Sequence, residues 1–279
     1  MIEIDELLQQ EAWRFWDQSL SGKSKSALES FAADDLLCHL VGQGQSPATV
    51  RTWVHDQTVV LGIQDHRLPF VDDAQDFLRT QGFTPIVRNS GGLAVVLDAG
   101  VLNISIVLSE LVQPIDISAG YEVMLEFVRL LLPEAEGKIE AYEIVGSYCP
   151  GSYDLSIDGK KFAGISQRRL RKGIAVQIYL CIDGSGSERA ELIRQFYDIG
   201  VQGEDTKFTY PDIKPEVMAS INELLGTSFT IQDIVIRIQQ LLQHLTPKVI
   251  SQSITEDEVA LYQFYMQRVL DRNKKMLEK

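Results

Sequence analysis

One short segment combines two residue types that could carry out acyl transfer. Residues 146–164 read Gly-Ser-Tyr-Cys-Pro-Gly-Ser-Tyr-Asp-Leu-Ser-Ile-Asp-Gly-Lys-Lys-Phe-Ala-Gly, and they contain Cys149 in a turn-rich stretch and Lys161 in a β-rich one. A thiolate is the nucleophilic form of cysteine, and a neighbouring ammonium stabilises it. The same ammonium can stabilise the oxyanion that forms when an acyl carbonyl is attacked. The segment therefore predicts a cysteine nucleophile, Cys149, assisted by Lys161.

A hairpin argument distinguishes Lys161 from its neighbour Lys160. Asp158-Gly159 is typical of a two-residue β-turn. Since side chains alternate along a strand, the two lysines point to opposite faces, and we expect Lys161 on the face away from the core, with Ser156 and Asp154. The expected cross-strand pairs are Ile157 with Lys160, Ser156 with Lys161, and Leu155 with Phe162.

Cys149 can meet Lys161 only if the chain folds back. Cys149 lies seven residues before Ser156, which is ~23 Å when fully extended. Pro150-Gly151 favours a type II turn that would reverse the chain. The other cysteines, Cys38 and Cys181, are interpreted as small buried hydrophobes.

Two further segments suggest binding. Arg88-Asn89-Ser90-Gly91-Gly92 lies between β-rich runs, and paired glycines permit close approach of a ligand or of another strand; an ordinary glycine turn is the alternative. Six cations without an acid among them lie within residues 160–172, although the formal net charge of the chain is −13. This stretch is either a solvated loop or a basic face that docks an acidic partner. The cations are Lys160, Lys161, Arg168, Arg169, Arg171 and Lys172.

The surrounding pattern predicts an α+β protein, with strands paired through turns and helices between the groups. We expect an N-terminal helical segment (1–34), a catalytic core (35–210) and a C-terminal helical region packed on the core (211–279). Helices are expected at 5–16, at 71–81, at 118–132 with Ser118 as its cap, at 188–197 with Ser187 as its cap, and at 216–225, 231–245 and 256–277; strands are expected at 53–61, 85–88, 93–97, 103–108, 142–145, 153–157 and 174–181.

Composition and missing motifs exclude several classes. With 26 Lys and Arg against 39 Asp and Glu, nucleic acid is a poor general partner. No run approaches the ~18 apolar residues of a membrane span, and the N-terminus lacks the pattern of a signal peptide. Three scattered cysteines indicate a reducing cytoplasm. Zinc-ligand spacing, a P-loop and a Gly-x-Ser-x-Gly elbow are absent from the sequence, so we expect no metal and no nucleotide cofactor.

The two motifs together resemble the lipoate-protein ligase A / biotin–lipoate transferase family over roughly residues 35–245. These motifs are Arg88-Asn-Ser-Gly-Gly with Asp98-x-Gly100-x-x-Asn103, and Asp154-Leu-Ser-Ile-Asp-Gly-Lys-Lys-Phe-Ala-Gly164. The resemblance implies mixed sheets flanked by helices, with additional C-terminal helices, and it assigns the family's essential lysine to Lys161. The acyl site that it implies comprises Arg88, Ser90, Gly91, Gly92, Ala163 and Gly164.

The segment around Cys149 looks most like the cysteine-dependent octanoyltransferases of that family. This similarity implies transfer of octanoyl from the glycine cleavage H protein to lipoyl domains of 2-oxoacid dehydrogenase E2 subunits, without a cofactor. The basic residues that could dock these acidic proteins are Lys160, Arg168, Arg169, Arg171 and Lys172.

Three alternatives remain open on the sequence. An ATP-dependent lipoate or octanoate ligase would use Lys161 against an acyl-adenylate and would not need Cys149. A related cysteine enzyme would take octanoyl from acyl carrier protein, which is also acidic. A scaffold without chemistry would bind lipoyl domains through the basic face.

Overall fold

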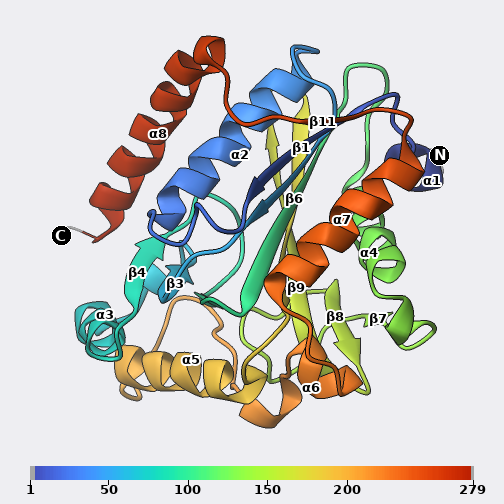
Figure 1. Ribbon diagram of the computed structural model, residues 1–279. Coiled ribbons are helices and arrows are strands. Elements are labelled where there is room, and N and C mark those ends of the chain that lie inside the picture. The colour runs from blue at the N-terminus through green and yellow to red at the C-terminus, as the bar shows by residue number, and fades with distance from the viewer. Residues whose placement is uncertain (1–3, 278–279) are drawn as a thin grey trace.

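A mixed eight-stranded sheet forms the centre of the protein (Figure 1), as seen in a computed structural model that describes residues 4–277. Strand β1 is parallel to both of its neighbours, whereas β6, β10, β9 and β8 are antiparallel to one another. The spatial order is β11 (Val249–Ser251), β1 (Trp13–Gln18), β2 (Thr49–Trp53), β6 (Val101–Ser109), β10 (Gly173–Cys181), β9 (Lys160–Leu170), β8 (Asp154–Ile157) and β7 (Glu140–Ala141).

A second, three-stranded sheet lies beside the main one. Its strands are β4 (Thr84–Val87), β3 (Thr58–Leu61) and β5 (Val95–Leu97), in that order. Each of the three is short and almost entirely buried, because the strands are flanked by helices and by the main sheet. The two sheets therefore face each other across an interior that side chains from both can line.

Helices cover both faces of the main sheet. On one face α4 and α7 enclose one apolar core, and on the other α2, α3, α5 and the small sheet enclose a second, with α8 packed along α2. This arrangement confirms the predicted α+β class. The helices are α1 (Ile4–Leu8), α2 (Ala27–Gly42), α3 (Val71–Thr80), α4 (Ile117–Leu131), α5 (Gly186–Val201), α6 (Ile221–Leu225), α7 (Ile231–Leu245) and α8 (Glu256–Leu277), with 3₁₀ turns η1 (Asp65–Arg67), η2 (Pro133–Ala135) and η3 (Pro215–Val217).

The prediction of a helix at 5–16 is wrong after Leu8, where α1 ends. Residues Trp13–Gln18 form strand β1 instead, and Trp13 and Phe15 are fully buried in the core. Bulky aromatic side chains suit a strand that lies between two others, and this packing outweighs the helical spacing of the apolar residues. The helices expected at 231–245 and 256–277 are confirmed, as is the helix at 71–80, which is followed by Gly82 in a left-handed conformation (φ +84°). The helix expected at 216–225 is only partly correct, because η3 (Pro215–Val217) and α6 (Ile221–Leu225) are separated by non-helical residues.

Several smaller expectations also need correction. Asp116 and Ser185 cap helices α4 and α5, because each accepts a hydrogen bond from the first turn where Ser118 and Ser187 were expected to do so. Residues 142–145 are not a strand, since the pairing with β8 ends at Ala141. The strand expected at 53–61 divides into the end of β2 and the whole of β3. The boundaries at 34 and 210 stay predictions.

Within residues 4–277, no helix combines the length and apolar character needed to cross a membrane.

Candidate active site

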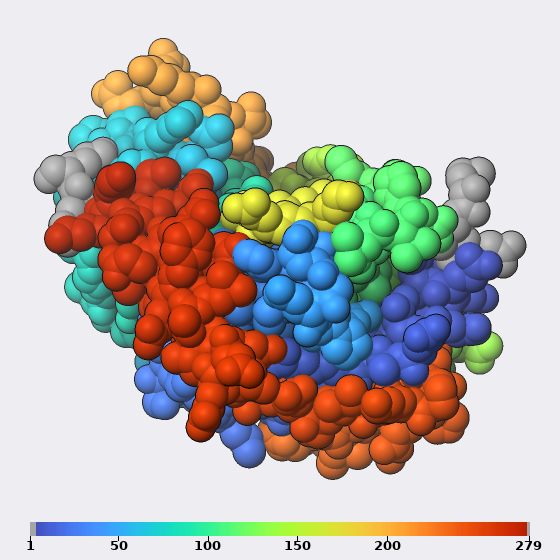
Figure 2. Space-filling view, turned by 90° about the horizontal axis from the view of Figure 1, so that it is seen from above, coloured from blue at the N-terminus to red at the C-terminus, as the bar shows by residue number. Residues whose placement is uncertain are grey.

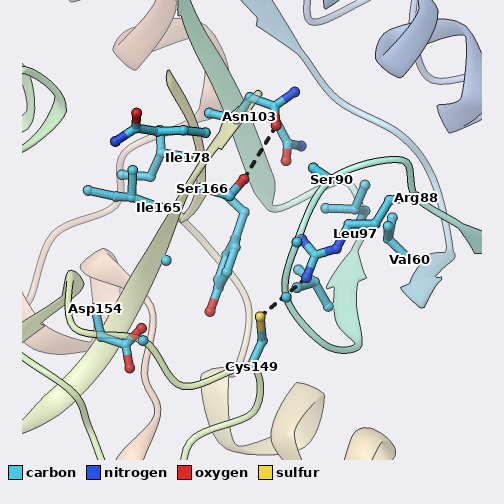
Figure 3. A pocket seen from close by; sticks show the side chains of 18 of the residues that line it. Val60, Arg88, Ser90, Leu97, Asn103, Cys149, Asp154, Ile165, Ser166 and Ile178 are labelled. Carbon is cyan, nitrogen blue, oxygen red and sulfur yellow. Dashed lines mark hydrogen bonds between the residues drawn. The ribbon is translucent and has the colours of Figure 1, made fainter. Parts of the chain in front are cut away.

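A cavity of about 280 Å³ lies between the two sheets, and Cys149 is in its wall. In Figure 3, Cys149 and Asp154 lie toward one end of this cavity, and Asn103 and Ser166 lie toward the other. The small sheet supplies apolar wall residues, the loop at 88–92 supplies small ones, and β9 and β10 close the opposite side. Among the lining residues are Phe31, Val60, Val95, Leu97, Ile165, Ile178 and Tyr179.

The Cys149 sulfur has two hydrogen-bond donors. Arg88 Nη2 lies 3.3 Å from Sγ, and the backbone nitrogen of Leu93 lies 3.2 Å from it. Both donors come from the loop that follows β4. The Cys149 side chain is partly exposed, whereas Cys38 and Cys181 are buried, as predicted. Of the three thiols, Cys149 alone therefore lines the cavity.

Backbone strain is concentrated at Cys149 itself. Its φ is +47°, in the left-handed region that side chains other than glycine rarely adopt. The expected type II turn at Pro150-Gly151 is wrong, because that turn would need the positive φ at Gly151. Instead the chain reverses through the strained Cys149 and a separate turn closed by the Asp154 amide and the Gly151 carbonyl.

The hairpin that carries Lys161 follows the prediction for its first two pairs only. Asp158 and Gly159 adopt the two positive φ angles of the expected turn, and Ser156 pairs with Lys161. Leu155, however, pairs with Ala163 and not with Phe162, because the register shifts between Leu155 and Ser156. The shift is a β-bulge, in which one strand contributes an extra residue opposite its partner.

Lys161 is completely buried and paired with Asp154, so the face expected to point away from the core is also interior. Its Nζ lies 2.8 Å from Asp154 Oδ1 and donates to the carbonyl oxygens of Tyr148 and Cys149, each at 2.9 Å. It also donates to Ser147 Oγ at 3.2 Å. Burial raises the pKa of Asp154 above its usual range, although Lys161 acts in the opposite direction.

The residues expected to bind an acyl group divide into two sets. Arg88, Ser90, Gly91, Gly92 and Gly164 line the cavity, whereas Ala163 packs into the main core. Gly164 is required there because a Cβ would lie 2.7 Å from Tyr179 Cε1. Adjacent strand residues point to opposite faces, which explains why Ala163 is separated from Gly164.

A buried charge network adjoins the cavity and was missed from the sequence. Arg51 Nη2 lies 2.9 Å from Asp34 Oδ1, and Ser105 and Gln177 donate to Asp34 Oδ2. The Arg51 guanidinium lies 5.7 and 5.2 Å from the ring centroids of Trp16 and Trp53. Burial lowers the pKa of Arg51, and Asp34 partly offsets that effect. Arg51 lies within a run of β-branched and aromatic residues, Thr49–Trp53, and this was the available signal.

The structure does not gather the cations of residues 160–172 into one face. Lys160 begins β9 and Leu170 ends it, which separates the ends by ~33 Å. Arg168 is paired with Asp35 at 2.7 Å and Arg169 with Glu110 at 3.2 Å. Arg171 and Lys172 form the β9–β10 turn. In Figure 2 the yellow part of the chain, to which the β9–β10 segment belongs, lies between α8 in red and the green segment around α4.

Comparison with known proteins places this chain in one family. Residues 26–245 match the model of the lipoyl protein ligase A/B catalytic domain. The chain belongs to this family.

Curated relatives and solved structures extend the comparison. An octanoyl-[GcvH]:protein N-octanoyltransferase of Lysinibacillus sphaericus is 63% identical over 98% of each chain. A lipoyl-[GcvH]:protein N-lipoyltransferase of Listeria monocytogenes is 49% identical over 97% of this chain and 98% of its own. A structure of lipoate-protein ligase A bound with ATP superposes with a TM-score of 0.65 at 18% identity, covering 87% of this chain and 90% of its own. A bi-partite lipoate protein ligase of Thermoplasma acidophilum gives 0.65 at 16%, covering 97% and 98%. At such low identity these two structures show the fold alone.

Proposed function

We propose that this chain is a cysteine acyltransferase that moves an octanoyl group from the glycine cleavage H protein to lipoyl domains of 2-oxoacid dehydrogenase E2 subunits, in the cytoplasm. The observation that carries the proposal is Cys149 Sγ in the cavity wall, with donors from Arg88 and Leu93. The names of relatives up to 63% identical supply the substrate and the donor protein.

The reaction proceeds in two balanced steps. The Cys149 thiolate attacks the octanoyl amide carbonyl on the donor lysine, a C–S bond forms, and the C–N bond breaks as the departing lysine nitrogen takes a proton. The amine of an acceptor lysine then attacks the thioester and loses a proton, a new C–N bond forms, and the thiolate is released. One amide replaces another, so the exchange needs neither a nucleotide nor a redox partner.

The cavity suits an acyl chain of this size. Its walls include Val60, Val95, Leu97 and Ile178, and the glycines Gly91, Gly92 and Gly164 line it without side chains. Octanoyl has six methylenes, and at about 0.8 kcal/mol each their burial contributes up to ~5 kcal/mol to binding. Exclusion of water from a thioester in this cavity favours transfer over hydrolysis.

Docking of the acidic partner proteins is assigned to the exposed tip of the β9–β10 turn. Arg171 and Lys172 lie at this tip, whereas the charges of Arg168 and Arg169 are partly neutralised by Asp35 and Glu110. Attraction between such a tip and an acidic surface accelerates encounter and weakens with salt.

Intact-protein mass spectrometry tests the proposal. The protein is mixed with octanoylated H protein without ATP, and a mass gain of one octanoyl group that hydroxylamine releases is expected. Cys149→Ala should abolish both this adduct and transfer to a lipoyl domain. Cys38→Ala is the matched control, because Cys38 is buried in α2 and should leave the adduct unchanged.

Two outcomes would overturn the proposal. If Cys149→Ala transfers octanoyl at the normal rate, the thioester route is wrong. If transfer occurs only when ATP and free octanoate are supplied, the protein is a ligase of the same family.

A further inference from the structure

We propose that Arg88, with the Leu93 amide, stabilises the Cys149 thiolate, and that Lys161 is a positioning residue that holds the backbone of Cys149. This inference rests on the proposed function only in taking Cys149 as the nucleophile. The sequence assigned stabilisation of the thiolate to Lys161, whereas this inference assigns it to Arg88 and leaves Lys161 to position Cys149.

The first observation is the direction of the donors. Arg88 Nη2 and the Leu93 amide approach the sulfur at 3.3 and 3.2 Å. Hydrogen bonds from a charged donor to an anion are stronger than those between neutral groups, so this pair favours the thiolate.

Gly92 makes this approach possible. Its φ is +105°, and a Cβ at this position would lie 2.1 Å from Arg88 Nη2 and 3.0 Å from Cys149 Sγ. The backbone around Gly92 is therefore shaped to bring the guanidinium and the sulfur together, and any side chain there would separate them.

The charge of Arg88 acts on the sulfur through a direct contact, and at longer range it also lowers the pKa of Asp65. Among residues 4–277 no carboxylate lies within ion-pair distance of Arg88, and its Nη2 is fixed instead by the Leu93 carbonyl oxygen at 2.6 Å. The side chain is 7% exposed, so water screens its charge little.

The charge of Lys161 is directed elsewhere. An ammonium has three N–H donors, and the four oxygens around Nζ belong to Asp154, Ser147, Tyr148 and Cys149. Its nearest anion is the Asp154 carboxylate, with which it forms a pair without net charge. The field of such a pair at the sulfur is much weaker than that of a single cation.

Lys161 nevertheless acts on Cys149 through the main chain. Its bonds to the carbonyl oxygens of Tyr148 and Cys149 fix the two peptide groups that flank the left-handed Cys149 residue. A strained conformation of this kind persists only when its surroundings determine it. The main chain of Lys161 is fixed in turn, because its carbonyl oxygen accepts a hydrogen bond from the Ala219 amide.

The test is the pH dependence of Cys149 alkylation by iodoacetamide, measured by intact mass on the folded protein. Arg88→Gln should slow alkylation about tenfold at neutral pH and move the profile to higher pH. Arg88→Lys should restore part of the rate. Arg194→Gln is the matched control, since Arg194 is an exposed arginine of α5 paired with Glu191 and should leave the profile in place.

The second arm is the double variant Lys161→Met with Asp154→Asn. It removes both charges together and so avoids leaving an unpaired carboxylate in the interior. The pH profile of alkylation should move much less than in Arg88→Gln, because Arg88 and the Leu93 amide are still present. Octanoyl transfer should fall at least tenfold, because the main chain that presents the sulfur to the acyl group is no longer fixed by Lys161.

The inference would be overturned if the alkylation profile moved to higher pH in the double variant but not in Arg88→Gln. Equal shifts in the two variants would overturn it as well. Failure of the proposed function is separate, because alkylation reports on the thiol whether or not Cys149→Ala abolishes transfer.

Discussion

Two buried ion pairs flank the cavity, and they differ in what else they bind. Arg51 and Asp34 lie among strands and helices, and their further partners are side chains and carbonyls of β1, β6, β10 and α2. Lys161 and Asp154 instead hold the loop at 144–149, through its amides and carbonyls. The first pair therefore joins elements of the scaffold, and the second sets the shape of the loop that presents the nucleophile.

The largest expected effect concerns the scaffold pair. Arg51→Leu leaves the Asp34 carboxylate buried without its cation, so the free energy of unfolding should fall by about 3–5 kcal/mol. Urea denaturation measures this loss. The double variant Arg51→Leu with Asp34→Leu should recover much of it, because no buried charge then remains. If the single variant lost less than about 1 kcal/mol, the Arg51–Asp34 pair would not be the main support of the scaffold, and the contrast with the Lys161–Asp154 pair would be wrong.

The next effect concerns two titrating groups, one beside the Arg51–Asp34 pair and one beside the loop at 88–92 that contacts Cys149. His55 adjoins the scaffold pair through Ser30, and burial lowers its pKa to about 4. Asp65 is the group on the side of the loop at 88–92, because its pKa is affected by Arg88. It accepts hydrogen bonds from the Tyr197 hydroxyl and the Gly62 amide, and burial raises its pKa to about 6. Between about pH 4 and 6 the native state lacks a proton on His55 that the unfolded chain carries, and it keeps a proton on Asp65 that the unfolded chain has lost.

The two groups should change stability in opposite directions. Stability from His55 increases as the pH rises from about 4 to 6.5, whereas stability from Asp65 is full below about pH 4 and is lost as the pH rises through 6. Asp65→Asn should therefore become more stable by about 3 kcal/mol across this range, and His55→Gln less stable by a similar amount. Urea titrations at several pH values check this, and parallel curves for the two variants would contradict it.

A smaller effect is expected where the cavity wall is tightest. Gly164→Ala forces the Tyr179 ring to move, and should cost about 1–3 kcal/mol of stability and slow octanoyl transfer. Gly151→Ala is the matched control, because its Cβ would meet nothing closer than Asp154 Oδ1 at 3.7 Å. Equal stabilities for the two variants in urea would show that the wall adapts freely.

The smallest effect lies at the edge of the scaffold network. Ser166 Oγ donates to Gln177 Oε1 at 3.3 Å, next to the cavity. Ser166→Ala should change the free energy of unfolding by only about 0.5–1 kcal/mol, because the bond is long and partly accessible to water. If Ser166→Ala lost as much stability as Arg51→Leu in the same urea assay, Ser166 would belong with the Arg51–Asp34 pair as a main support of the fold.

The sequence predicted the local parts of the site and missed the long-range ones. The turn at Asp158-Gly159 and the pairing of Ser156 with Lys161 follow from neighbouring residues alone, and both are confirmed. The bulge beside Leu155 depends on how β8 must bend against β7 and β9, which no local pattern shows.

The contact between Arg88 and Cys149 joins residues 61 positions apart, and it was not anticipated. Arg88 was identified only as part of a glycine motif, because the sequence does not indicate which loop will pack against which sulfur. The scaffold pair was missed for the same reason, since Arg51 and Asp34 come from separate elements whose packing decides that both are buried.

The two edges of the main sheet have a consequence for synthesis of the chain. Both edge strands, β7 and β11, are only two or three residues long, so the finished sheet offers little backbone for another chain to pair with. Strand β1 pairs on its outer side with β11, which the ribosome makes after all the other strands of the main sheet. Until β11 emerges, the outer edge of β1 therefore lacks its partner strand, and unpaired strand edges of this kind favour aggregation during synthesis.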